Sequence, residues 1–283
     1  MHRVLKELAR PFKRLKRRVI RPEIYDGLRA CKKGAARLLG RGDAGTGEQV
    51  SIILPDHHRT ELLRRAMLSV IGQPYTNYEL LVVLDGPEPG TREAALEFRD
   101  NPKVRIFEIK ENTGNASLPR NVGIAEASYP LVTFLDSDDL LHPNKLSVLA
   151  GMMGDADVVY GNSLIDNNGR RYASETVKVD MDRLLRKNYI PTTTAVVRRE
   201  PLMELGGFKP KMRYMEDYEL WARLMYHGCR FRYVKGIFGV YNLHDGNLEP
   251  SFAGESDRWK ETLLEEYRLV PEAMALPDYE ALE

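Results

Sequence analysis

Residues 131–139 read LVTFLDSDD, in which an apolar and β-branched run leads directly into three carboxylates. The run is typical of a buried strand, and Asp136, Asp138 and Asp139 follow where it ends. Like charges this close are costly unless a cation neutralises them, and carboxylate oxygens suit Mg²⁺ or Mn²⁺. An acidic turn before a helix that begins at Pro143 explains the same residues. The segment therefore predicts either a metal-assisted site or a capping turn.

Outward from this segment, short apolar strands alternate with helical patterns. The patterns predict strands at 50–54, 80–84, 104–109 and 131–135, and helices at 60–71, 91–99 and 119–127. This alternation predicts an α/β fold with a mostly parallel sheet flanked by helices on both faces. Ligands of such sheets bind at the carboxyl ends of the strands. Polar residues follow Leu54, Leu84 and Leu135 at those ends.

Beyond Asp139 the alternation becomes irregular. The patterns predict helices at 143–153 and 216–226, strands at 157–160 and 193–197, and one or two strands within 231–241. The letters DNNG at 166–169 are a hairpin-turn signal. We therefore expect the second half of the chain to extend the sheet in a less regular way.

The net charge hides an asymmetry along the chain. The 283 residues carry a formal charge of +1, yet residues 1–42 hold 14 Lys and Arg against 3 Asp and Glu, and the remainder holds 28 Lys and Arg against 38 Asp and Glu.

Two cysteines, Cys31 and Cys229, exclude a disulfide framework and a four-cysteine zinc site. No apolar run approaches the roughly 18 residues that span a bilayer, and the basic start lacks the apolar core of a signal peptide. These features predict a cytoplasmic protein.

Residues 1–42 have the spacing of a basic amphipathic helical arm, and a glycine-rich linker follows at 43–49. Apolar side chains recur in the arm every three or four residues, at Leu5, Leu8, Phe12, Leu15 and Val19. One interpretation is peripheral binding to an anionic membrane surface on its inner face, where each basic residue contributes about 1 kcal/mol. A second is packing on the acidic body or on another copy in a homo-oligomer. A third is nucleic-acid binding, which the shortage of aromatic residues makes unlikely.

Short motifs occur in a fixed order between residues 48 and 250. They are the strand ending at Pro55, SVIGQPY at 69–75, Asp85-Gly86, NTG at 112–114, PRNVGIA at 119–125, FLDSDD at 134–139, HPNKL at 142–146, GGF at 206–208 and EDYELW at 216–221. Each motif alone is weak, but in this order the segment resembles the family-2 glycosyltransferases with the GT-A fold. The resemblance implies a Rossmann-like α/β domain that binds nucleotide-sugars.

The resemblance also assigns roles to residues at the matching positions. It implies donor contacts from Pro55, Asp56, Asp85, Arg120, Asn121, Asp136 and Ser137, and metal contacts from Asp138, Asp139 and His244. It implies Asp217 as the catalytic base with Glu216 beside it, and an acceptor face with Thr193, Tyr214 and Trp221. From the residues alone, Glu216 and Asp217 also fit an acid-rich first helical turn. In the same way, His244 fits a solvated loop and Trp221 a core position.

The implied reaction moves a sugar, with inversion, from a nucleoside-diphosphate sugar to a hydroxyl of a glycan or lipid-linked acceptor, in surface-polysaccharide or glycoconjugate synthesis. Mn²⁺ or Mg²⁺ offsets charge on the departing diphosphate, and a carboxylate removes the hydroxyl proton. The implied organisation is a donor-binding half at 50–142, an acceptor-binding half at 143–250 and an acidic helical tail at 251–283.

One departure from the family pattern lies directly after the first strand. Residues 56–59 read DHHR, where relatives usually carry a Tyr or another apolar residue and then Asn, so the nucleotide stays open. The same position lacks the glycine-rich loop of nucleotidyltransferases, which disfavours that enzyme class. A non-catalytic GT-A-like module that binds a membrane or a partner through the arm is the alternative function.

Overall fold

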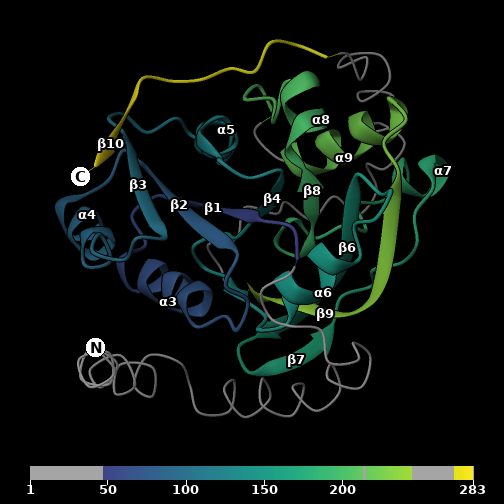
Figure 1. The fold of residues 1–283 in the computed structure, drawn as a ribbon, viewed down its shortest axis with the longest axis horizontal. Coiled ribbons are helices and arrows are strands. Elements are labelled where there is room, and N and C mark those ends of the chain that lie inside the picture. The colour runs from purple at the N-terminus through teal and green to yellow at the C-terminus, as the bar shows by residue number, and fades with distance from the viewer. Residues whose placement is uncertain (1–46, 213–214, 244–270, 283) are drawn as a thin grey trace.

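The computed structural model describes residues 47–212, 215–243 and 271–282. In these ranges a single sheet runs through the molecule between two layers of helices (Figure 1). Its strands are β1 (Val50–Asp56), β2 (Tyr78–Asp85), β3 (Val104–Ile109), β4 (Leu131–Phe134), β5 (Leu140–Leu141), β6 (Val158–Asn167), β7 (Arg170–Ala173), β8 (Val196–Arg198), β9 (Phe231–Leu243) and β10 (Tyr279–Leu282). The arm predicted at 1–42 and residues 43–46 of the linker lie outside the described residues.

The strand order divides the sheet into a parallel and a mixed half. The order is β10-β3-β2-β1-β4-β8-β6-β9-β5, with β7 paired to β6. Neighbours among β1 to β4 pair in parallel. Beyond them, β8 is antiparallel to both β4 and β6, and β9 is parallel to β6. The predicted α/β fold with flanking helices is confirmed, and its sheet becomes mixed after β4.

Helices bury both faces of the sheet. One core lies under α3 (Thr60–Ile71), α4 (Pro89–Leu96) and α6 (Lys145–Gly151), and the other under α5 (Ser117–Glu126), α8 (Arg199–Glu204) and α9 (Glu216–Tyr226). The short α7 (Met181–Leu184) and the 3₁₀ turn η1 (Thr192–Thr194) connect β7 to β8. Because both faces are covered, β1 and β2 are buried along their whole lengths, which explains their continuous apolar sequences.

Local sequence explains one close helix–strand contact and one tight turn. At Gly123 in α5, a Cβ would lie 2.4 Å from the side chain of Ile53, so glycine lets α5 approach β1. The hairpin predicted at 166–169 joins β6 to β7. Asn168 and Gly169 both have positive φ angles there, as a two-residue hairpin turn requires, and the Asp166 carboxylate accepts a hydrogen bond from the Gly169 backbone NH at 2.8 Å.

The segment 271–282 corrects the prediction of a helical tail. It runs past α8 and α5, as Figure 1 shows in yellow, and ends in β10, which pairs antiparallel with the outer edge of β3. The free edge of β3 offers unpaired backbone groups that a strand satisfies and a helix does not. Residues 251–270 of the predicted tail lie outside the described residues.

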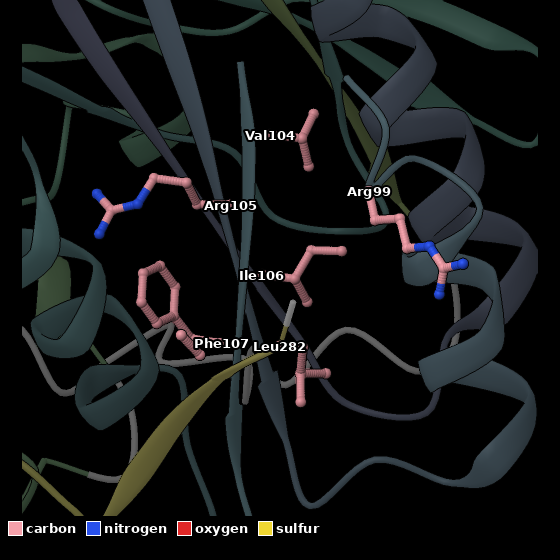
Figure 2. Close-up of a pocket in the computed structure, with 7 residues that line it drawn as sticks. Arg99, Val104, Arg105, Ile106, Phe107 and Leu282 are labelled. Carbon is pink, nitrogen blue, oxygen red and sulfur yellow. The ribbon is translucent and has the colours of Figure 1, made fainter. Parts of the chain in front are cut away.

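A cavity of about 220 Å³ lies beside the β3–β10 pair. Figure 2 shows the Ile106 and Leu282 side chains near Arg99, whereas Phe107 extends from the other side of β3. No predicted site residue within the described ranges lines this cavity. Among the described residues, no helix has the length and apolar character to cross a bilayer.

Candidate active site

Three strands bring carboxylates to the same side of the sheet, where their carboxyl ends lie. Asp56 is the last residue of β1, Asp85 is the last residue of β2, and Asp136 follows β4 by two residues. Because β1 pairs in parallel with both β2 and β4, these carboxyl ends are neighbours. The structure therefore places the polar residues where the sequence pattern predicted them.

Asp85 is held by the loop that follows β3. Its two carboxylate oxygens accept hydrogen bonds from the Thr113 backbone NH at 2.9 Å and the Thr113 hydroxyl at 2.8 Å. Burial raises the pKa of Asp85, and the bonds from Thr113 oppose that shift. Gly86 has a φ of 57°, and a Cβ there would lie 2.6 Å from the Asn112 backbone nitrogen. The Asp-Gly pair therefore allows the Asn112 loop to pack on the end of β2.

Two histidines cover this strand end. His57 Nδ1 lies 2.7 Å from the Asp85 carbonyl oxygen, and His57 Nε2 lies 2.8 Å from the Asn112 amide nitrogen. A carbonyl oxygen only accepts, so Nδ1 carries the proton and Nε2 accepts from Asn112. The His58 ring stacks on His57 with 3.8 Å between ring centroids. The DHHR departure therefore forms an ordered imidazole pair beside Asp85.

Asp56 meets the acidic loop after β4. Burial raises the pKa of the Asp56 carboxyl, whereas a hydrogen bond to the Ser137 side chain lowers it. In the described part of the chain, Asp56 Oδ1 is buried and has no hydrogen-bond partner. A buried carboxylate oxygen without a donor is costly, so this atom is a candidate contact for a ligand NH or OH.

The acidic loop at 136–139 directs its three carboxylates to different partners. Asp136 Oδ1 accepts from Arg120 at 2.7 Å, and Asp138 forms an ion pair with Arg59. Asp139 instead faces the protein interior, where its oxygens accept from the Thr193 hydroxyl at 2.6 Å and the Asn242 backbone NH at 3.1 Å. Burial and the neighbouring carboxylates raise the pKa of Asp139 well above its ordinary value.

Arg120 connects the acidic loop to α9. Besides Asp136, it donates to Glu216 at 2.6 Å, and its guanidinium lies 5.1 Å from the centre of the Phe208 ring. The Arg120 side chain is only 4% exposed, so the ion pairs are largely shielded from water. This one side chain therefore links Asp136 of the acidic loop to the first turn of α9.

The carboxylate of Asp217 has neutral partners. Its Oδ2 accepts from the Thr192 hydroxyl at 2.7 Å and the Asn188 amide at 3.1 Å, and its Oδ1 accepts from the Tyr218 backbone NH at 2.7 Å. Burial, followed by repulsion from Glu216, raises the pKa of Asp217 to about 6, while the hydrogen bonds and Arg120 oppose the shift. A carboxylate with a pKa near the working pH suits general-base catalysis.

Sequence comparisons identify the family of this chain. Residues 51–206 match the profile described as Glycosyl transferase family 2. The chain belongs to this family. It is 33% identical, over 62% of its length and 69% of the relative's, to the Escherichia coli UDP-Glc:alpha-D-GlcNAc-diphosphoundecaprenol beta-1,3-glucosyltransferase WfgD. A shorter match, over 44% of this chain and 39% of the relative, gives 35% identity to the poly(ribitol-phosphate) beta-N-acetylglucosaminyltransferase TarP of Staphylococcus aureus strain N315.

Solved structures show the same fold. Staphylococcus aureus TarS 1–349 in complex with UDP-GlcNAc superimposes with a TM-score of 0.62 over 78% of this chain and 69% of TarS, at 20% identity. TarS 1–349 without a named ligand gives a TM-score of 0.60 over 69% of this chain and 60% of TarS. The expected glycosyltransferase fold of the GT-A type is therefore confirmed.

Within this family-2 fold, three side chains differ from their predicted roles. Trp221 is fully buried and donates from Nε1 to the Ile190 carbonyl at 3.1 Å, so it is a core residue and not an acceptor contact. Thr193 is buried, and its hydroxyl donates to Asp139 and not outward to a ligand. Asn121 is fully buried and bonds the backbones of Phe208 and Ala275 instead of a nucleotide. Tyr214 and His244 lie outside the described residues.

The acidic loop fits a divalent-cation site with only one or two protein ligands better than a site in which protein side chains supply most of the ligands. In the ranges that the structure describes, no group of three or more His, Cys, Asp or Glu side chains is arranged to hold a metal ion. Mg²⁺ often takes only one or two protein carboxylates and completes its shell with phosphates and water. Asp136 and Asp138, at 31% and 8% side-chain exposure, fit that donor set, whereas the inward carboxylate of Asp139 does not.

Several residues around these carboxylates were not among the site residues predicted from the sequence. Thr113, Asn188 and Thr192 hold carboxylates, and Arg59 pairs with one. Thr192 belongs to a run of three threonines, which was a visible signal. Asn188 gave none, because an isolated polar residue in a loop resembles any solvated position.

Proposed function

We propose that this chain transfers a sugar from a nucleoside-diphosphate sugar to an acceptor hydroxyl with inversion at the anomeric carbon. One observation carries the proposal. Arg120 joins Asp136 at the donor edge of the sheet to Glu216, whose neighbour Asp217 is a half-buried carboxylate with a pKa raised to about 6. The buried guanidinium of Arg120 therefore holds the proposed donor site next to the proposed base.

Asp217 acts as the general base in the proposed reaction. Above pH 6 its carboxylate accepts the proton of the acceptor hydroxyl as that oxygen attacks the anomeric carbon. The bond from the anomeric carbon to the diphosphate oxygen breaks, and its electron pair leaves with the nucleoside diphosphate. Attack from the face opposite the leaving group inverts the anomeric centre. Asn188 and Thr192 keep the carboxylate in place during this step.

The donor lies along the carboxyl ends of β1, β2 and β4. Asp85 and the unpaired Oδ1 of Asp56 accept hydrogen bonds from the nucleoside, and the imidazole pair of His57 and His58 borders it. Asp136 and Asp138 would hold Mn²⁺ or Mg²⁺. When bound there, the cation offsets charge on the departing diphosphate.

The relatives support a narrower substrate class. The name of WfgD specifies UDP-Glc and a diphosphoundecaprenol-linked acceptor, and TarS has been solved with UDP-GlcNAc. We therefore favour a UDP-sugar donor and a lipid-linked or polymeric glycan acceptor, as in surface-polysaccharide or glycoconjugate synthesis.

A binding screen tests the donor proposal. Sugar nucleotides that differ in base and sugar are added to the full chain, with and without Mn²⁺, and the melting temperature is measured. A true donor at one hundred times its Kd adds about 2.7 kcal/mol to the free energy of unfolding. Stabilisation by a UDP-sugar that increases with Mn²⁺ is expected. An unchanged melting temperature with every nucleotide contradicts the proposal.

We also propose that residues 1–42 attach the enzyme to an anionic membrane surface on the cytoplasmic side, where lipid-linked acceptors would be reached. Their charge of +11 supports this proposal. Sedimentation with anionic liposomes measures it, with neutral liposomes as the control. Equal sedimentation after deletion of residues 1–42 contradicts it.

A further inference from the structure

The turn η1 consists of three threonines whose hydroxyls have different partners. Thr192 donates to Asp217 at 2.7 Å, and the next residue, Thr193, donates to Asp139 at 2.6 Å. Thr194 instead bonds backbone carbonyls, those of Gly161 at 2.8 Å and Pro191 at 2.9 Å. Two consecutive side chains therefore reach the two sides of the site, the base on α9 and the acidic loop after β4.

A buried lysine fixes the backbone of this turn. The Lys145 amine, at the start of α6, donates to the Thr193 carbonyl at 2.7 Å and to the Thr133 hydroxyl on β4. Lys145 is fully buried, and burial lowers its pKa to about 7 while Asp139 and Asp136 oppose that shift. An ammonium group in the core is costly, so its position requires these acceptors. The lysine thereby fastens η1 to the strand that leads into the acidic loop.

The hydrogen-bond partners of Asp217 orient its carboxylate and do not neutralise the negative charge. Thr192 and Asn188 both donate to Oδ2, which fixes the plane of the carboxylate, and among the residues that the structure describes no cation contacts Asp217 directly. The charged groups that act on Asp217 are Glu216 beside it and Arg120 from α5. Neutral donors therefore set the direction of the base and leave it able to take up a proton.

We propose that Thr192 and Thr193 are positioning residues of the transfer reaction, which hold the base Asp217 and the acidic loop at a fixed separation across η1. The inference rests on the proposed function, because it takes Asp217 as the base. Thr192 acts through Asp217 on the acceptor hydroxyl, and Thr193 acts through Asp139 on the loop that receives the donor.

The decisive experiment compares Thr192→Val with Thr192→Ser in the full chain. Valine keeps the shape of threonine and removes the hydroxyl, whereas serine keeps the hydroxyl. Misplacement of a catalytic group by about 1 Å costs on the order of 10²-fold, so we expect Thr192→Val to lower kcat by about 10-fold to 100-fold. The donor KM should stay within about twofold. Loss of a bond to the charged carboxylate should also move the acidic limb of the kcat profile to higher pH, and Thr192→Ser should restore both values.

Thr194→Val is the matched control from the same turn. It removes a hydroxyl whose bonds go to backbone carbonyls, so it should lower the melting temperature without moving the acidic limb. An equal shift of that limb in Thr194→Val would mean that general packing of η1 is responsible, and it would overturn the inference.

Thr193→Val tests the donor side of the turn. Because Thr193 holds Asp139, we expect a donor KM raised by about tenfold with a smaller change in kcat, and recovery in Thr193→Ser. Wild-type KM in Thr193→Val would overturn this half of the proposal.

A double variant separates the inference from the proposed function. In the Asp217→Asn background, Thr192→Val should have no further effect on kcat, because both changes act through one group. Full turnover by Thr192→Val with an unmoved acidic limb overturns the inference, while wild-type turnover and donor-induced stabilisation still support the glycosyltransferase. Wild-type activity in Asp217→Asn overturns both.

Discussion

The carboxylates at the donor edge and the carboxylate on α9 are the same chemical group in two different settings. Asp136 and Asp138 each meet an arginine, Arg120 and Arg59. Asp217 is held by the hydroxyl of Thr192, the amide of Asn188 and a backbone NH. The first two carboxylates each form a direct ion pair, whereas at Asp217 burial and the neighbouring Glu216 raise the pKa to about 6. The difference separates groups suited to bind charge from the one suited to move a proton.

The largest expected effect comes from Asp217→Asn. An amide of the same size has no basic oxygen, so we expect kcat to fall by about 10²-fold to 10⁴-fold, with the Kd of the donor nearly unchanged. Initial rates and calorimetric titration with the UDP-sugar measure the two quantities. Asp180→Asn is the control, because Asp180 is an exposed acid that caps the short α7. Near-normal turnover in Asp217→Asn would mean that Asp217 is not the base and does not differ in function from the carboxylates that pair with arginines.

Arg120→Met tests the other setting, in which a carboxylate is paired with an arginine. It leaves Asp136 and Glu216 facing each other without their shared cation, and breaking a buried pair costs about 3–5 kcal/mol. We expect the low end of that range, because the Asp136 side chain is 31% exposed. Denaturant unfolding measures the loss. Arg199→Met is the matched control, since in the part of the chain that the structure describes Arg199 bonds the Ile124 and Ala125 carbonyls and no carboxylate, and it should be less damaging.

The pH dependence of kcat examines Asp217 without a mutation. The base works only as a carboxylate, so kcat should fall about tenfold per pH unit below its pKa. Because burial and Glu216 raise that pKa to about 6, the fall should begin near pH 6 and not near pH 4. A profile that is flat from pH 7 to pH 5 contradicts this setting for the base.

The smallest expected effect is that of Arg59→Gln on cation binding. Removing one positive charge beside Asp138 changes the free energy of a nearby cation by about 1 kcal/mol in a water-like dielectric, which is roughly a fivefold gain in Mn²⁺ affinity. Calorimetry of Mn²⁺ binding without nucleotide measures it. Arg92→Gln is the control, because Arg92 pairs with Glu108 on β3. Weaker Mn²⁺ binding in Arg59→Gln would show that Arg59 supports the cation site.

The periodicity of the sequence predicted the parallel half of the fold well. The helix predicted at 60–71 is α3, and the ends of β2 and β4, near Asp85 and Asp136, lie on either side of the end of β1, as expected of parallel strands. Predictions were weaker where a residue type fits two environments. Trp221 suits both a sugar-stacking position and a core, and its burial against Ile190 decides for the core. The strand β10 was missed, because a short terminal run has no visible pattern until it meets the edge of β3.

The sequence by itself determined where the strands of the parallel half lie along the chain and which carboxylates follow them, since both depend on local runs of apolar residues and on what comes directly after. The tertiary structure decided the partner of each carboxylate. Arg59 and Asp138 are 79 residues apart, Arg120 and Glu216 are 96 apart, and Thr192 and Asp217 are 25 apart. Local periodicity carries no information about such pairs, because they form only when separate elements pack. That packing made some of these acids partners of arginines and gave one of them, Asp217, neutral hydrogen-bond donors and a raised pKa.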